Sequence, residues 1–226
     1  MNIKKHSTAK GSQRATGIVV IIDVLRACTT IPILLKNGAD TIIPVKTIDD
    51  AQKYLNRGYV LIGEGKNGCI HDSFHYCNSP SEIHSIDFTE KNLVIRSNNA
   101  TQAILNIEKA TDIILASFVN LEAIVTYIND HYAKDVALVP LGRLNQEGLE
   151  DELCAEAIKL RLENTFFDFE KMKKEINDCP CAKLVRDTLD KPEDVAFALE
   201  LNSYPIVPKV YTEDGQKVIK NASLND

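Results

Sequence analysis

The first apolar run of the chain and its continuation read Gly17-Ile18-Val19-Val20-Ile21-Ile22-Asp23-Val24-Leu25-Arg26-Ala27-Cys28-Thr29-Thr30. The run is short, rich in Ile and Val, and bounded by polar residues, which is typical of a buried strand. Residues 27–37 then follow with the spacing of a helix. The stretch therefore predicts a strand at 17–23 that leads directly into a helix, as in a βαβ unit.

The same alternation continues along the chain. Further Ile- and Val-rich runs predict strands at 41–45, 59–63, 92–96, 112–117 and 135–140. Segments with helical spacing lie between and after them, at 48–57, 101–109, 121–131 and 149–164. Alternating strands and helices predict the α/β class, with a three-layer α/β/α arrangement around a mostly parallel or mixed sheet.

The two ends of the chain depart from this alternation. Residues 1–16 contain Lys4, Lys5, Lys10 and Arg14, and we expect a flexible, solvated arm there. Helical segments at 168–177, 181–189 and 192–201 predict a C-terminal helical lobe, followed by a polar, extended tail. With 226 residues in all, 17–226 is expected to form a single α/β domain, or two fused lobes that meet near 140–165.

Net charge, apolar runs and the cysteine count exclude some classes of binding partner and indicate the cellular compartment. A net charge of -6 gives no general attraction for nucleic acid, and no apolar run approaches the length of a membrane span. Asp23 and Arg26 interrupt the run at 17–22, which is too short for a signal peptide. Six cysteines are too few for a disulfide scaffold in a chain of this length. We therefore expect a cytoplasmic protein with reduced thiols and no nucleic-acid or membrane partner; a homo-oligomer is common for intracellular enzymes of this size.

The junction after the first strand is the first candidate site, because open parallel sheets bind ligands beyond the carboxyl ends of their strands. Arg26 offers a fork that matches phosphate or sulfonate oxygens, and Asp23 is a suitable ligand for Mg²⁺. Thr29 and Thr30 can donate to a phosphoryl oxygen near the start of the helix. The alternative is a capped helix with an Asp–Arg pair.

Polar residues follow other predicted strands as well. They lie in Gly63-Glu64-Gly65-Lys66-Asn67-Gly68, in Ser97-Asn98-Asn99-Ala100-Thr101, in Ser117-Phe118-Val119-Asn120 and at Glu150-Asp151. Each is ordinary when taken alone, as a turn, a helix cap or a partner of the helix dipole. Their recurrence at successive strand ends favours a shared site. The glycine-rich turn matches neither the phosphate loop of nucleotide hydrolases nor the dinucleotide-binding fingerprint.

With these motifs in order, the chain resembles the 2-phosphosulfolactate phosphatase family, magnesium-dependent phosphatases of coenzyme M biosynthesis. The resemblance covers residues 17–210. It rests on Val20 to Ile31, Gly38-Ala39, Gly63-Glu64, Asn78-Ser79-Pro80, Asn99 with Thr101, Ser117 with Asn120, Glu150-Asp151, Asp194-Val195-Ala196 and Val207-Pro208. It implies an α/β phosphatase that uses Mg²⁺ and acts on a small phosphorylated anion.

We accordingly predict hydrolysis of a phosphomonoester, 2-phosphosulfolactate or a related phospho-hydroxy acid. Whether water or Asp23 attacks the phosphorus stays open. The expected catalytic residues are Asp23, Arg26 and Glu64; the expected metal ligands come from Asp23, Glu64, Glu150 and Asp151. The expected substrate-binding residues are Arg26, Thr29, Thr30, Lys66, Asn78, Ser79, Asn99, Thr101 and Asn120.

Two alternatives to a phosphatase stay open. The family usually has Arg where this chain has Gly65, and Gly where it has Ala100, so a binding protein without turnover is the main rival. A structural protein, in which the strand-end residues are only caps, is the second. A zinc site built from Cys69, His71, His75 and Cys77 is disfavoured because the spacing is not that of a common zinc finger.

Overall fold

The computed structural model describes residues 1–65, 68–131 and 134–222. The strands lie where the apolar runs predict them, with additional strands at both ends of the chain: β1 (Asn2–Lys5), β2 (Gly17–Ile22), β3 (Ile42–Pro44), β4 (Val60–Gly63), β5 (Leu93–Arg96), β6 (Ala110–Ala116), β7 (Asp135–Pro140), β8 (Pro208–Glu213) and β9 (Gln216–Asn221). The α-helices are α1 (Thr8–Ser12), α2 (Ala27–Lys36), α3 (Ile48–Gln52), α4 (Pro80–Ile83), α5 (Ala100–Asn106), α6 (Leu121–Asp130), α7 (Leu149–Leu162), α8 (Phe169–Asn177), α9 (Pro180–Lys183) and α10 (Pro192–Ala198). Short turns of 3-10 or π helix lie at η1 (Leu55–Arg57), η3 (Phe118–Asn120) and η4 (Leu184–Thr188).

The strands form one mixed sheet in the order β1-β7-β2-β6-β8-β9-β3-β5-β4. The group β1, β7, β2 and β6 is parallel throughout, and so is the group β3, β5 and β4. The hairpin of β8 and β9 joins the two groups through antiparallel pairs, β8 with β6 and β9 with β3. The predicted α/β class with a mostly parallel or mixed sheet is confirmed.

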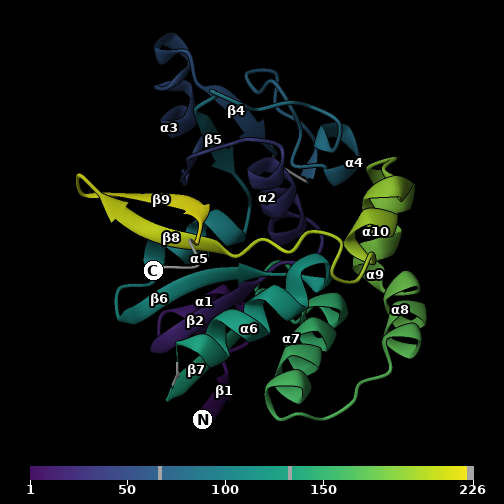
Figure 1. Cartoon of the computed structure of the whole chain (residues 1–226). Coiled ribbons are helices and arrows are strands. Elements are labelled where there is room, and N and C mark those ends of the chain that lie inside the picture. The colour runs from purple at the N-terminus through teal and green to yellow at the C-terminus, as the bar shows by residue number, and fades with distance from the viewer. Residues whose placement is uncertain (66–67, 132–133, 223–226) are drawn as a thin grey trace.

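Two apolar layers cover opposite faces of the first strand group, as the alternation of side chains along a strand requires. Val19 and Ile21 of β2 pack with α2 and α5 in one core cluster. Ile18 and Val20, which point the other way, pack with α6, α7 and the C-terminal helices in a second cluster. Figure 1 shows α8, α9 and α10 gathered together at one end of the sheet. No helix in the described part of the chain is long and apolar enough to cross a membrane.

The hairpin of β8 and β9 occupies the part of the chain expected to be a polar, extended tail, so that expectation is wrong. Figure 1 shows the hairpin, in yellow, between β6 and β5. Glu213 pairs with Gln216, which leaves Asp214 and Gly215 as a two-residue turn, both with positive φ. Asp-Gly is a strong hairpin signal because such turns match the twist of the strands. The adjacent residues Val218 and Ile219 of β9 are both buried, in two different core clusters, so β9 is covered on both faces.

The N-terminal residues also differ from the expected flexible arm. β1 is the edge strand of the sheet and pairs in parallel with β7 from Asn2 to Lys5. Ile3 packs against the second core cluster. Lys5 forms an ion pair with Glu152 of α7, and Ser7 donates a hydrogen bond of 2.6 Å to the same carboxylate. Pairing with β7, the packing of Ile3 and the contacts to Glu152 together hold this strand on the sheet.

Candidate active site

The segments after β2, β4, β5 and β7 converge on a cleft of about 370 Å³. One wall of the cleft comes from the C-terminal helices, which close it with apolar side chains. The lining residues are Leu25, Arg26, Glu64, Gly68, Asn98, Asn99, Gly142, Arg143, Leu144, Glu150, Cys181, Leu184, Val185 and Leu189. The sequence-predicted residues that line this cleft are Arg26, Glu64, Asn99 and Glu150.

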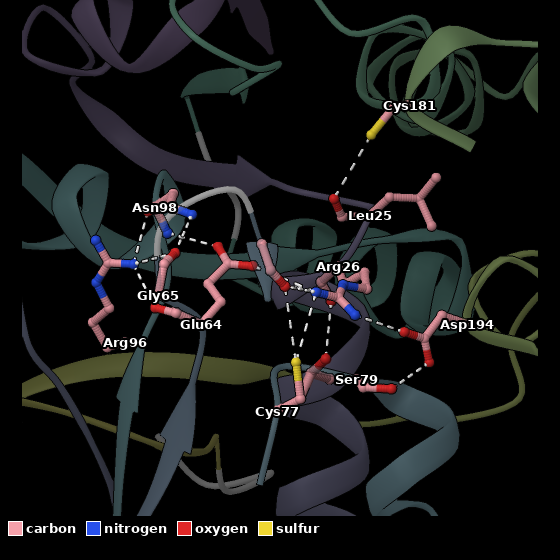
Figure 2. Close-up of polar contacts among 12 residues, drawn as sticks. Leu25, Arg26, Glu64, Gly65, Cys77, Ser79, Arg96, Asn98, Cys181 and Asp194 are labelled. Carbon is pink, nitrogen blue, oxygen red and sulfur yellow. Dashed lines mark hydrogen bonds and ion pairs between the residues drawn. The ribbon is translucent and has the colours of Figure 1, made fainter. Parts of the chain in front are cut away.

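Arg26 lies at the floor of the cleft, directly before α2, and the peptide bond that precedes it is cis. Its Nη1 is 2.9 Å from Oδ2 of Asp194, and its Nη2 donates to the carbonyl of Gly68 at 2.8 Å. A second carboxylate, that of Glu64, lies 3.5 Å from Nη2. Figure 2 shows the guanidinium between these groups. Its side chain is only 2% exposed, so the charge is held almost entirely by the protein.

Asp194, on α10, is the carboxylate that fixes Arg26, and it is fully buried. Its Oδ1 accepts hydrogen bonds from Ser79 Oγ at 2.7 Å, from Ser81 Oγ at 2.7 Å and from the Ser81 backbone N–H at 2.9 Å. Both oxygens of this carboxylate therefore accept hydrogen bonds, as a buried charge requires. Ser79, which the sequence predicts to bind substrate, donates its hydroxyl hydrogen bond to Asp194 in this structure.

Glu64 follows β4 and is oriented by residues that follow β5. The backbone N–H of Asn98 donates to its Oε1 at 2.8 Å. Arg96 Nη1 donates to the Glu64 carbonyl at 2.6 Å and to Asn98 Oδ1 at 2.7 Å, as Figure 2 shows. These contacts tie the two strand ends together and leave the Glu64 carboxylate on the cleft wall beside Arg26.

Asp23 lies behind the cleft lining and is 7% exposed. Burial raises its pKa to about 7, and the negative charges of Glu64 and Glu150 add to the effect. The backbone N–H of Ala27 and the charge of Arg26 oppose this rise. An added positive charge close to Asp23 would therefore stabilise its ionised form and lower its pKa.

Asp151 and Glu150, at the start of α7, differ in role although they are adjacent. Asp151 is buried, and its two oxygens accept backbone N–H groups, from Val24 at 2.7 Å and from Gly142 at 2.8 Å. Burial, with the charges of Glu150 and Asp23, holds the pKa of Asp151 well above its ordinary value. Glu150 lines the cleft, with Cys179 Sγ 3.5 Å from its Oε2.

The remaining predicted residues lie off the cleft lining, and local contacts occupy most of their side chains. Thr29 and Thr30 donate to the carbonyls of Val24 and Arg26, so these hydroxyls stabilise the turn and the first helical residues. Thr101 bonds to Ser97, and Asn120 donates to the carbonyls of Leu115 and Ile206. Asn78 is buried, and its Oδ1 has no partner in the described part of the chain. Lys66 lies outside the described residues.

Asn98, Arg143 and Asp194 belong to the site, although they are absent from the expected set. Asn98 precedes Asn99 in the polar segment that follows a predicted strand, and Asp194 belongs to the Asp194-Val195-Ala196 motif of the family resemblance, so the sequence contained a signal for both. Arg143 carries no pattern of its own in the sequence. Its position depends on the turn that follows β7, which only the fold places at the cleft.

The carboxylates of the cleft are the groups that could hold a metal ion. Within residues 1–65, 68–131 and 134–222, no three His, Cys, Asp or Glu side chains form a ready metal cluster. Mg²⁺, however, commonly takes only one or two carboxylates, together with water and phosphate oxygens. Burial is the main cause of the raised pKa of Asp23, and the negative charges of Glu64 and Glu150 add to it, so a divalent cation bound beside these carboxylates would offset that repulsion.

Comparison with known proteins shows the family of the chain. The family model described as 2-phosphosulpholactate phosphatase matches residues 3–213. A probable 2-phosphosulfolactate phosphatase of Pseudothermotoga lettingae is 30% identical over 91% of this chain and 93% of its own length. One from Thermoplasma acidophilum is 32% identical over 85% of each chain. One from Thermotoga petrophila is 41% identical over 63% of this chain, and the match spans 61% of that relative. The chain belongs to the 2-phosphosulfolactate phosphatase family.

Proposed function

We propose that the protein is a Mg²⁺-dependent phosphomonoester hydrolase that acts on 2-phosphosulfolactate or a related phospho-hydroxy acid. The observation that carries the proposal is that Arg26, Glu64 and Glu150 line one cleft, with the buried carboxyl group of Asp23 behind its lining. Carboxylates that repel one another beside a guanidinium suit a cation and a phosphoryl group bound together. Family membership supplies the substrate class as a phosphorylated metabolite.

Asp23, Glu64 and Glu150 are the residues we assign to the metal. Asp151 is the less suitable ligand, because both of its oxygens already accept backbone N–H groups. It acts instead by holding the turns after β2 and β7 in place. A bound Mg²⁺ would neutralise phosphoryl oxygens and favour the ionised form of Asp23.

The chain's own residues position the phosphoryl group and exclude water. Arg26 has five N–H donors, and the contacts to Asp194 and Gly68 use part of that set. The remaining donors are assigned to phosphoryl oxygens. Leu184 and Leu189, on the helical wall, limit the access of bulk water. Ionised Asp23 either removes a proton from the attacking water or attacks phosphorus itself.

A binding protein without turnover is the second candidate, and the state of Arg26 favours it. Two carboxylates already neutralise this guanidinium, which is almost fully buried. In an enzyme, the phosphoryl group must therefore compete with Glu64 for Arg26. A binding protein would bind the phosphorylated ligand without releasing phosphate.

Phosphate release tests the two functions. The panel contains 2-phosphosulfolactate, 2-phospholactate and an aryl phosphate, each with Mg²⁺ or with a chelator. The proteins are the wild type, Asp23→Asn and the control Asp49→Asn, which removes an exposed carboxylate in α3. Hydrolysis predicts release that requires Mg²⁺, persists in the control and is lost in Asp23→Asn. Saturable binding with no phosphate release from any compound would contradict the proposed hydrolysis and support the binding function.

A further inference from the structure

The described part of the cleft is lined by two basic side chains, those of Arg26 and Arg143. They differ sharply in their surroundings. Arg26 is buried between the carboxylates of Asp194 and Glu64. Arg143 is half-buried, and within residues 1–65, 68–131 and 134–222 its guanidinium has neither an ion pair nor a hydrogen bond. The cleft thus contains one neutralised cation and one cation whose charge is available to a ligand.

The backbone that carries Arg143 is fixed from both sides. The N–H of Gly142 donates to Asp151 at 2.8 Å, and the carbonyl of Gly142 accepts from Asn99 Nδ2 at 2.9 Å. Arg143 and Gln146 then exchange two backbone hydrogen bonds, each of 2.9 Å, which close a tight turn. A residue on such a turn loses little backbone entropy when it binds a ligand. The turn therefore presents Arg143 to the cleft at a defined place.

Arg143 also lies between two hollows. It lines the cleft with Glu150 and Cys181, and it lines an adjoining hollow of about 460 Å³ with the same two residues. Arg143 is half-buried, whereas Arg26 and Asp23 are buried, so Arg143 lies nearer to solvent than they do. A ligand whose phosphoryl group reached the carboxylates at the floor would extend its other end toward Arg143.

We infer that Arg143 binds the acidic group of the substrate that is not the phosphate, a carboxylate or a sulfonate. The inference rests on the proposed function, because it takes the phosphoryl group to lie at Asp23, Glu64, Glu150 and Arg26. A planar guanidinium pairs with two oxygens of either acid at once, which selects acid-bearing phosphoesters over neutral ones. Arg143 is therefore a specificity-determining residue.

Calorimetric binding separates this role from that of the phosphate site. The probes, each with Mg²⁺, are 2-phospholactate, 2-(phosphooxy)ethanesulfonate and propan-2-yl phosphate, whose tail is uncharged. Arg143→Gln is expected to weaken binding of the acid-bearing probes by about tenfold to a hundredfold, since it removes charge-assisted hydrogen bonds. Binding of propan-2-yl phosphate should change by less than twofold. Arg14→Gln, which removes an exposed arginine far along the sequence, is the matched control.

The two acid-bearing probes identify which oxyanion Arg143 receives, and a loss for either supports the inference. Equal losses for all three probes, no loss for either acid, or no binding of the acids by the wild type would overturn it. If Arg143→Gln is unfolded by circular dichroism, Arg143→Lys replaces it and is judged by the same selective loss. Selective binding that depends on Arg143, without phosphate release from any probe, would contradict hydrolysis while sustaining this inference.

Discussion

Asp194→Asn isolates the contribution of the buried ion pair to stability. Breaking such a pair by removal of one charge typically costs about 3–5 kcal/mol, because the other charge is left buried. Glu64 remains 3.5 Å from Arg26 as a second counter-charge, and Asn can still accept hydrogen bonds from Ser79 and Ser81. We therefore expect the lower end of that range, about 3 kcal/mol of unfolding free energy, in urea denaturation at pH 7.

Glu193→Gln is the matched control for this measurement, since Glu193 is the neighbouring residue of α10 and is exposed. It should change the unfolding free energy by less than about 0.5 kcal/mol. Asp194→Asn should also weaken phosphate-ester binding, and Asp194→Glu should restore part of that affinity by restoring the charge. A loss below about 1 kcal/mol in Asp194→Asn would refute the reasoning, because it would mean that Arg26 does not depend on Asp194.

Three further changes test other parts of the structure. The pKa of Asp23 is raised from 3.8 to about 7, so the buried carboxylate destabilises the folded state increasingly as pH rises from about 4 to 7. In urea denaturation at pH 8, Asp23→Asn should therefore be more stable than the wild type, by at most about 4 kcal/mol of unfolding free energy. At pH 4 the difference between the two proteins should be much smaller. Gly142→Ala should lower the unfolding free energy by about 2 kcal/mol or more, because residue 142 has a φ of +59° and the added Cβ would clash with the carbonyl of Gln146. An unchanged urea midpoint would contradict this. Iodoacetamide at pH 8 should label the exposed Cys69 but not the buried Cys28, because burial raises the pKa of the Cys28 thiol well above its ordinary value. Equal labelling of the two cysteines, measured by mass spectrometry of peptides, would contradict the burial of Cys28.

The sequence predicts the buried strands well because each carries its own signal. The run from Ile18 to Ile22 is apolar at every position, as a strand covered on both faces must be. The turn chemistry of Asp214-Gly215 carries a signal too, but polar neighbours in the tail obscured it. β1 has no such signal, since Ile3 alone among its residues is apolar and the strand depends on pairing with β7.

The candidate site is less predictable, because a polar residue at a strand end has the same appearance whether it contacts a ligand or the backbone. Arg26 and Glu64 line the cleft, whereas Thr29 and Thr101 hydrogen-bond to nearby chain atoms. The difference depends on which way each side chain points after the strand ends. Asp194 is separated from Arg26 by 168 residues, and only the packing of α10 brings the two together.

The β8–β9 hairpin connects the two groups of strands, and the cleft takes residues from both. Arg26 follows β2 in one group, and Glu64 follows β4 in the other. The hairpin pairs with each group at a single residue pair, Ile114 with Lys209 and Ile42 with Ile219, and both groups contribute side chains to the first core cluster. The Arg26–Glu64 ion pair supplies a further connection, between residues that follow strands of different groups. A ligand that draws Arg26 away from Glu64 would therefore alter the connection between the two groups at the point where it binds.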